Sequence, residues 1–154
     1  MGRSLGSCDI RQLEDFEARL RQLPDRAVFF EACARELAAR LLRKAIKRTP
    51  VGVYPPRTGK KGGTLRRGWT AGKDVKTYVN SLVVRRRGNT YIIEVTNPVE
   101  YAPYVEFGHR TRGGTGWVEG KFMLTISEQE IEAVSFSILS QKLDRMLREL
   151  FENG

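Results

Sequence analysis

Few residues in this chain have the type and spacing that metal binding requires. The 154 residues include a single histidine, His109, and two cysteines, Cys8 and Cys33. Zinc sites in proteins use about four Cys, His or carboxylate ligands at short, recurring spacings. These three residues show no such spacing, so the sequence predicts neither a metal site nor a cofactor.

Catalytic groups are not indicated either. A side-chain nucleophile needs a base that a third group orients, and His109, in a glycine- and arginine-rich stretch at 108–116, has no evident partner. A metal-dependent nuclease needs clustered carboxylates, and Glu119-Gly-Lys121 is the only fragment of that kind. Asp74 or Glu94 could supply a second carboxylate, but no pattern brings either nearby. We therefore predict that the protein is not an enzyme, with a small nuclease as the less favoured alternative.

A third candidate for chemistry is the basic, glycine-rich segment at 49–64. A phosphate-binding loop has four residues between its glycines, followed by Lys and then Ser or Thr. Here six residues separate Gly52 from Gly59, and Lys60 is followed by Lys61. The segment is therefore predicted to be a long flexible loop, and loops of this length are usually functional or disordered. We expect residues 54–63 to be mobile in the isolated chain and ordered after assembly.

Charge is distributed unevenly along the chain, whose formal net charge is +9 at pH 7. Residues 26–89 hold 17 basic and 3 acidic side chains, a local charge of +14, whereas residues 1–25 sum to −1 and residues 90–154 to −4. Such a basic segment indicates an anionic partner. That partner is nucleic acid phosphate or the acidic surface of another protein, which includes the carboxy-terminal part of a neighbouring copy. A solvated basic surface is the simpler alternative.

The composition is that of one domain. The chain is 40% hydrophobic, long enough to bury a core and too short for two ordinary domains. No apolar run approaches the roughly 20 residues of a membrane helix, and the amino terminus lacks the apolar stretch of a signal peptide. We expect a single domain over residues 1–154, made and kept in the cytosol, with both cysteines reduced.

Helical periodicity is clear in the first third of the chain. Apolar residues between Asp9 and Leu23 recur every three to four positions, which predicts a short helix within residues 1–25. Asp25 can then cap a basic helix at 26–48. The predicted buried face of that second helix is Phe30, Cys33, Ala34, Leu37, Leu41 and Ala45.

The carboxy-terminal segment, residues 122–154, also has a helical pattern. Ser127 and Glu130 have the spacing of a capping box, in which each side chain bonds to a backbone N–H group near the other residue. Apolar residues continue at helical spacing beyond this pair. The sequence therefore predicts a long helix from Glu128 to about Phe151.

Strand patterns occupy residues 65–97. Leu65–Thr70, Leu82–Arg86 and Tyr91–Thr96 read as strands, and Val75–Val79 shows a weaker alternation. Arg87-Gly-Asn89 is predicted to be a hairpin turn. The expected fold class is α+β, with an antiparallel sheet of about three to four strands packed against amino-terminal and carboxy-terminal helices that cover one face of it, and long basic Gly-rich loops.

Four short motifs follow one another along the chain in a recognisable order. They are a helix ending in Thr49-Pro-Val51, the strand start Gly63-Thr-Leu-Arg-Arg67, the turn Tyr101-Ala-Pro-Tyr-Val-Glu-Phe-Gly108 and the step Phe122-Met-Leu124. In these motifs the chain resembles the neck or tail-completion proteins of tailed bacteriophages, the group similar to lambda minor tail protein Z. The chain departs from that pattern by the inserted residues 54–63, and by His109 where Ser or Thr is usual.

The resemblance implies a non-enzymatic structural protein of a tailed phage, a prophage or a tailocin. It implies a homo-oligomeric ring of copies, sixfold as tails are, that joins the tail terminator and tail tube to the connector in the neck. The protein would be made in the bacterial host cytoplasm and end in the virion or tail particle, with only non-specific DNA contact in the passage. A basic nucleic-acid-binding module is the alternative, although the predicted strands show no aromatic platform for stacking bases.

Assembly contacts are expected in the basic loop and in segment 98–121, interpreted as a tyrosine turn followed by a basic loop. Aromatic and arginine side chains are frequent anchors of protein interfaces, and acidic groups beside the turn can meet basic groups of another copy. Packing of the turn against the last helix is the alternative. The predicted interface residues are Arg57, Lys60, Lys61, Arg66, Arg67, Trp69, Glu100, Tyr101, Tyr104, Glu106, Phe107 and Trp117.

Overall fold

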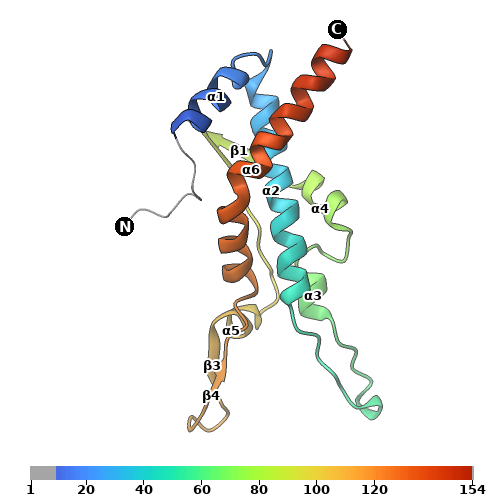
Figure 1. Ribbon diagram of the computed structural model, residues 1–154. Coiled ribbons are helices and arrows are strands. Elements are labelled where there is room, and N and C mark those ends of the chain that lie inside the picture. Colours follow the sequence, from blue (N-terminus) through green and yellow to red (C-terminus); the bar gives the residue numbers. More distant parts are fainter. Residues whose placement is uncertain (1–9, 154) are drawn as a thin grey trace.

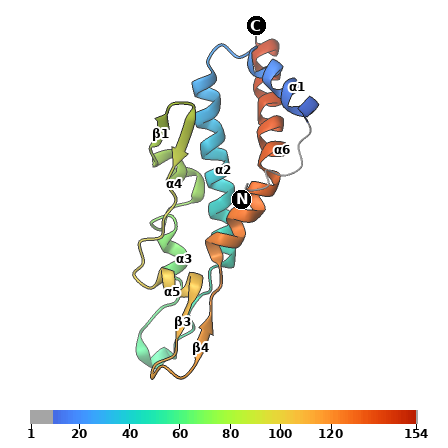
Figure 2. The same cartoon turned by 90° about the vertical axis from the view of Figure 1, so that its left-hand side faces the viewer.

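Two long helices set the length of the molecule. Helix α2 spans Arg26–Arg48 and helix α6 spans Met123–Glu152, and they run in opposite directions side by side (Figures 1 and 2). This computed structural model describes residues 10–153. The predictions for Cys8, and for the part of the first helix before Ile10, lie outside the described residues.

Helix α2 begins where the sequence predicts. Asp25 caps it, since its Oδ1 accepts a hydrogen bond from Ala27 N at 2.9 Å. The buried residues of α2 are Phe29, Cys33, Ala38, Leu42 and Ala45. Cys33 is buried as expected, but the centre of the buried face differs from the predicted one, because α2 contacts α6 on one side and α4 with the β1–β2 hairpin on another.

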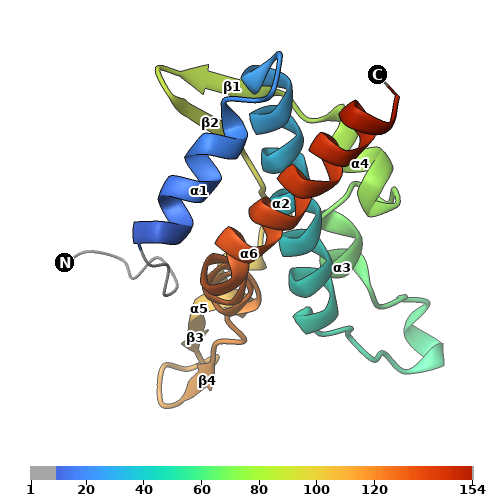
Figure 3. The same cartoon turned by 45° about the horizontal axis from the view of Figure 1, so that its top comes forward.

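The amino-terminal helix, α1 (Ile10–Leu20), packs against the middle of α6, and Figure 3 shows it at the same end of the molecule as the start of α2. The Phe16 and Phe136 rings are 5.5 Å apart, and Arg19 forms an ion pair with Asp144 of α6. A cluster of buried residues lies below α1, composed of Leu23, Phe29, Cys33, Leu143 and Leu147. One core therefore closes this end of the helix pair.

Two segments predicted to be strands are helices. Helix α3 spans Thr64–Gly68 and helix α4 spans Val75–Ser81. In α4, Val75, Tyr78 and Val79 pack on one core at helical spacing, and the Oδ1 of Asp74 accepts a hydrogen bond from Thr77 N at 3.0 Å. The alternation of Val75–Val79 is therefore misleading, because an N-cap signal precedes it.

The strands form two separate antiparallel hairpins. In the first, β1 (Val84–Arg87) pairs with β2 (Thr90–Ile93) through the predicted turn, where Gly88 has a φ of 61°. In the second, β3 (Gly108–Arg110) pairs with β4 (Trp117–Glu119). The α+β class and the number of strands agree with expectation. The strands are divided between two hairpins, however, and α2 and α6 pack mainly against each other instead of covering one sheet.

The start of α6 differs from the prediction. The helix begins at Met123, so Ser127 lies one turn inside it and is buried. The Ser127 hydroxyl donates to the Met123 carbonyl at 2.6 Å, and Glu130 pairs with Lys44 and Arg48 of α2 instead of reaching back to a cap. Helix α6, like every other helix within residues 10–153, is not long and apolar enough to cross a membrane.

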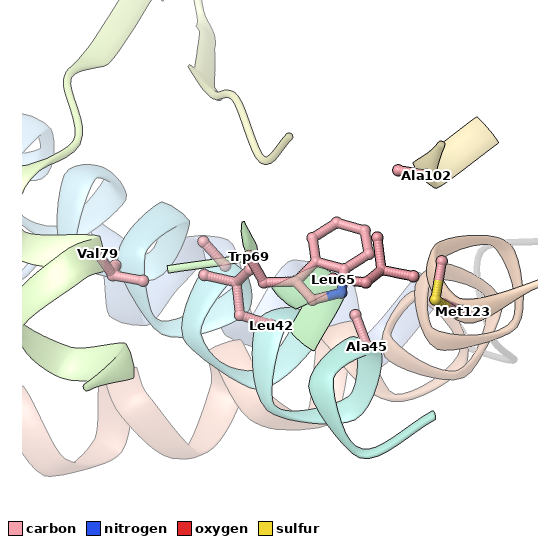
Figure 4. Packing of buried hydrophobic residues seen from close by; sticks show 8 residues of the cluster. Leu42, Ala45, Leu65, Trp69, Val79, Ala102 and Met123 are labelled. Atoms are coloured by element: carbon pink, nitrogen blue, oxygen red, sulfur yellow. The ribbon is translucent and has the colours of Figure 1, made fainter. Parts of the chain in front are cut away.

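A second core lies around Trp69, directly after α3. Its side chain is 3% exposed, and Figure 4 shows it among residues from α2, α3, α5 and α6. The indole Nε1 donates to the Thr49 hydroxyl at 2.7 Å. The prediction that Trp69 is an interface anchor is therefore wrong, because a side chain held in the core is not available to a partner.

Candidate assembly interface

Two arms project from the end of the molecule that lies opposite α1 (Figures 1 and 2). The long arm is the segment between α2 and α3, residues 50–63, and contains one 3₁₀ turn at Pro56–Thr58. The short arm is the β3–β4 hairpin, residues 108–119, which follows helix α5 (Ala102–Phe107). The two predicted interface regions, far apart in sequence, therefore lie at one end of the fold.

The base of the long arm is fixed by its flanking residues. Arg66 Nη2 donates to the Thr49 carbonyl at 2.8 Å, and Arg67 Nη1 donates to the Gly62 carbonyl at 3.2 Å. The two sides of the arm approach so closely that a Cβ on Gly62 would lie 2.0 Å from the Gly52 carbonyl oxygen. Arg66 and Arg67, both predicted interface residues, thus hold the arm at its base, and glycine is required where its sides meet.

The short arm is attached to α6 through Glu106. This carboxylate is 7% exposed and accepts hydrogen bonds from Leu124 N at 3.0 Å, Thr125 N at 2.8 Å and the Thr125 hydroxyl at 2.7 Å. It satisfies N–H groups that the first turn of a helix leaves unpaired. The prediction that Glu106 meets another copy is therefore wrong, because its hydrogen-bonding capacity is used within the chain.

The remaining aromatic residues of the prediction are on the surface. Tyr101, Tyr104 and Phe107 of the α5 region are exposed, and Trp117 on β4 is 55% exposed. The Tyr104 ring stands edge-on to His109 at 6.1 Å. For Tyr101, Tyr104 and Phe107, this exposure disfavours the alternative in which the turn packs against α6. Large apolar side chains exposed together near one end of a protein are typical of a contact with another protein.

Basic side chains accompany this apolar surface. Arg57, Lys60 and Lys61 of the long arm are exposed, as is Glu100 before α5. No ion pair involves these four residues in the part of the chain that the structure describes. Lys60 Nζ instead lies 5.8 Å from the centre of the Tyr54 ring. Their charges are therefore available to a partner of opposite sign.

The groups considered for catalysis have structural roles or stand apart. His109 Nδ1 lies 2.9 Å from the Arg110 carbonyl oxygen, and Glu119 is exposed on β4. Asp74 caps α4, and hydrogen bonds from Thr77 lower the pKa of its carboxyl. Glu94 pairs with Arg85 at 3.6 Å. Within residues 10–153, no three His, Cys, Asp or Glu side chains are grouped in a way that could hold a metal ion.

The pKa of the Cys33 thiol is strongly shifted by its surroundings. Burial is the main cause and raises the pKa of the thiol. The positive charge of Lys142 lowers it and the negative charge of Glu36 raises it, and the resulting pKa is about 12. A thiol with such a pKa is a poor nucleophile at neutral pH. Its position within the core below α1 gives it the role of a small apolar side chain.

Sequence reasoning missed two features of this end. It interpreted residues 108–121 as a loop, whereas they contain a hairpin, and it overlooked Val53, which is 94% exposed on the long arm. Gly113 and Gly114, both with positive φ, lie shortly before the apolar pair Trp117-Val118. Glycines of this kind beside apolar residues are a hairpin signal.

One comparison with known proteins gives a match. The sequence model of a family described as "Bacteriophage HK97-gp10, putative tail-component" matches residues 14–108. The matched stretch is more than half of the chain and runs from α1 through the long arm and the first hairpin to the end of α5. Neither the curated proteins nor the solved structures give a significant match.

Proposed function

This chain belongs to the HK97-gp10-like family of bacteriophage tail components, and from that premise we propose that it is a neck protein that completes the tail and joins it to the head. The family match agrees with the resemblance to phage tail proteins that the sequence motifs indicate. A tail component is a structural protein, and we propose that this one acts through assembly without catalysing a reaction.

The proposed assembly is a ring of six copies. The ring would connect the tail terminator and tail tube on one side to the connector on the other, in a complete phage, a prophage or a tailocin. The observation that supports it best is that exposed aromatic side chains of the α5 region and the short arm lie at the same end of the molecule as the exposed basic side chains of the long arm (Figure 1). Every copy in a ring needs an exposed surface that can bind its neighbour, whereas a monomeric protein does not.

DNA passes through the neck, and a weak contact with it is part of the proposal. The basic excess of residues 26–89 includes the exposed side chains Arg85, Arg86 and Arg87 on and next to the first hairpin turn. Such a contact would be independent of sequence and would weaken steeply between about 50 and 200 mM salt. Tight binding to one DNA sequence at physiological salt would favour the nucleic-acid-binding alternative instead.

The test is complementation of a phage that lacks this gene. Tyr104→Ala and Phe107→Ala remove exposed aromatic side chains of the α5 region, and they should leave the monomer folded. Truncating an aromatic anchor commonly costs about 2 kcal/mol or more of binding free energy. We expect both variants to reduce the number of joined particles counted by negative-stain microscopy, and the amount of this chain in purified particles.

His109→Ala and Glu119→Ala are the matched controls, since they alter the candidate catalytic groups near the same surface. Both should support particle assembly and infection close to the level of the unchanged chain. If either one blocks infection while the chain is still incorporated into particles, a chemical role exists and the structural proposal is wrong.

A further inference from the structure

An apolar groove lies on the side of the molecule between α2, β2 and α6. Its volume is about 750 Å³, and its floor includes Leu37 and Leu41 of α2, Ile92 of β2 and Ile131 of α6. Pockets of about 300–1,000 Å³ accept a drug-sized group, so this groove has room for a few side chains. No described segment of the chain fills it.

Acidic side chains line the α6 side of the groove. Glu128 and Glu132 are one helical turn apart, and both border the groove. Within residues 10–153 neither carboxylate forms an ion pair. Glu130, between them in sequence, has its charge balanced by Lys44 and Arg48. The groove thus combines an apolar floor with two unpaired negative charges.

The long arm has the complementary chemistry. Among residues 10–153, Val53 is the most exposed of the large apolar side chains, and Tyr54 beside it is also exposed. Arg57, Lys60 and Lys61 follow in the same arm, and among residues 10–153 none of them forms an ion pair with an acidic side chain. The arm therefore offers an apolar group followed by positive charges, where the groove offers an apolar floor beside negative charges.

We propose that the long arm of one copy docks in the groove of the neighbouring copy, with Val53 on the apolar floor and Lys60 and Lys61 beside Glu128 and Glu132. This inference rests on the proposed ring and names the contact that builds it. The arm leaves the end of the molecule and points away from the elements that form its own groove (Figures 1 and 2). The occupant is accordingly the arm of a second copy.

Such a contact joins two different surfaces. An interface of this head-to-tail kind generates a closed ring when the rotation between neighbours closes, whereas an interface between identical surfaces stops at a dimer. The arm and the groove are on different parts of the molecule, as a ring contact requires. Every copy then gives one arm and receives one.

Charge reversal tests the pairing. The arm variant carries Lys60→Glu and Lys61→Glu, and the groove variant carries Glu128→Lys and Glu132→Lys. Facing like charges strongly disfavour a contact, so each variant alone should lower incorporation of the chain into particles by about tenfold or more. In the chain that carries all four substitutions the charges are opposite again, and incorporation should recover. None of the four side chains forms an ion pair in the described part of the chain, so circular dichroism and the melting temperature should match those of the parent.

Co-expression of the two variants gives a second, independent readout. An acidic arm then meets a basic groove, and a basic arm meets an acidic groove, so a ring of alternating copies should form although neither variant forms one alone. Recovery in both the four-substitution chain and the mixture is the expected result. If the groove receives a different tail protein, neither will recover, and the inference is overturned.

The same experiments distinguish a failure of the arm-to-groove contact from a failure of the proposed function. If both variants are incorporated as well as the parent chain, the arm-to-groove contact is wrong while the protein remains a tail component. If the parent chain itself is absent from purified particles and the deletion does not affect tail joining, the proposed function fails first.

Discussion

The body of the molecule and its two-armed end differ in two respects: whether apolar side chains are buried, and whether charged side chains form ion pairs. In the body, α2 and α6 enclose apolar cores, and charged groups such as Lys44, Arg48 and Glu130 pair across the helices. On the arms, Val53 and Trp117 are exposed, and Lys60 has no acidic partner among the described residues. Burial and pairing identify the residues that fold the chain. Exposure without pairing identifies those that remain for a partner.

The two tryptophans should show the largest contrast between these regions. Trp69→Ala empties a core site and removes the hydrogen bond to Thr49, so it should lower the free energy of unfolding by about 3–5 kcal/mol. Trp117→Ala, on the exposed face of β4, should change it by no more than about 0.5 kcal/mol. Denaturant titration of both variants is the measurement. Similar losses for the two would contradict the division between body and arms.

Two glutamates near α5 give a second contrast. Glu106→Ala leaves the N–H groups of Leu124 and Thr125 without their acceptor, which should cost about 1–3 kcal/mol of stability. Glu100→Ala removes an exposed carboxylate and should be nearly neutral. Thermal unfolding, followed by circular dichroism, measures both. An Ala variant at 106 as stable as the parent would show that α6 does not need this cap.

Limited proteolysis of the unmodified protein compares how readily the long arm and the helical body are cleaved. Exposed loops with few backbone hydrogen bonds are cut first, so trypsin should cleave the free protein after Arg57, Lys60 or Lys61 before it cleaves α2 or α6. The same sites should be protected in assembled particles if the arm docks there as proposed. Mass spectrometry of the earliest fragments identifies the first cut. A first cut inside α2 would mean that the body, rather than the arm, opens most readily.

The smallest expected effect concerns pH. Hydrogen bonds from Lys44 and then Arg48 lower the pKa of Glu130 below its ordinary value. The folded state then binds fewer protons than the unfolded state, so this contribution is complete above the unfolded pKa of about 4.3 and is lost as the pH falls through the lower folded value. Glu130→Gln should therefore reduce stability at pH 7 and have less effect near pH 3. Glu149→Gln, elsewhere on α6, is the control for removing a carboxylate.

Sequence patterns predicted the long elements well. Asp25 and the apolar periodicity located α2, and periodicity located most of α6, because a helix cap and a buried face are local properties of the chain. The turn at residues 87–89, between β1 and β2, was also predicted correctly, because its signal is local in the sequence. These elements contain their own signals and need no distant contact to be recognised.

The errors involve contacts between residues that are distant in sequence. Helix α6 starts at Met123 because Glu106, 18 residues before Leu124, accepts from its first turn. Trp69 is buried because Thr49, 20 residues earlier, supplies a hydrogen-bond acceptor inside the core. No sequence pattern with a fixed spacing predicts either of these two hydrogen bonds. Trp69 follows a glycine in a basic segment, so the sequence pattern alone suggests an exposed interface residue, and only the fold shows that it is buried.

The close approach of Gly52 and Gly62 at the base of the long arm bears on how this protein can diverge. The two sides of the arm meet there and are tied to Thr49 and α3, so residues between them can be lost or added without disturbing the core. Each doubling of a flexible loop's length costs only about 0.6 kcal/mol of closure entropy. Related phages could therefore exchange arm tips of different length and charge on one unchanged body, and so acquire new assembly partners without evolving a new fold.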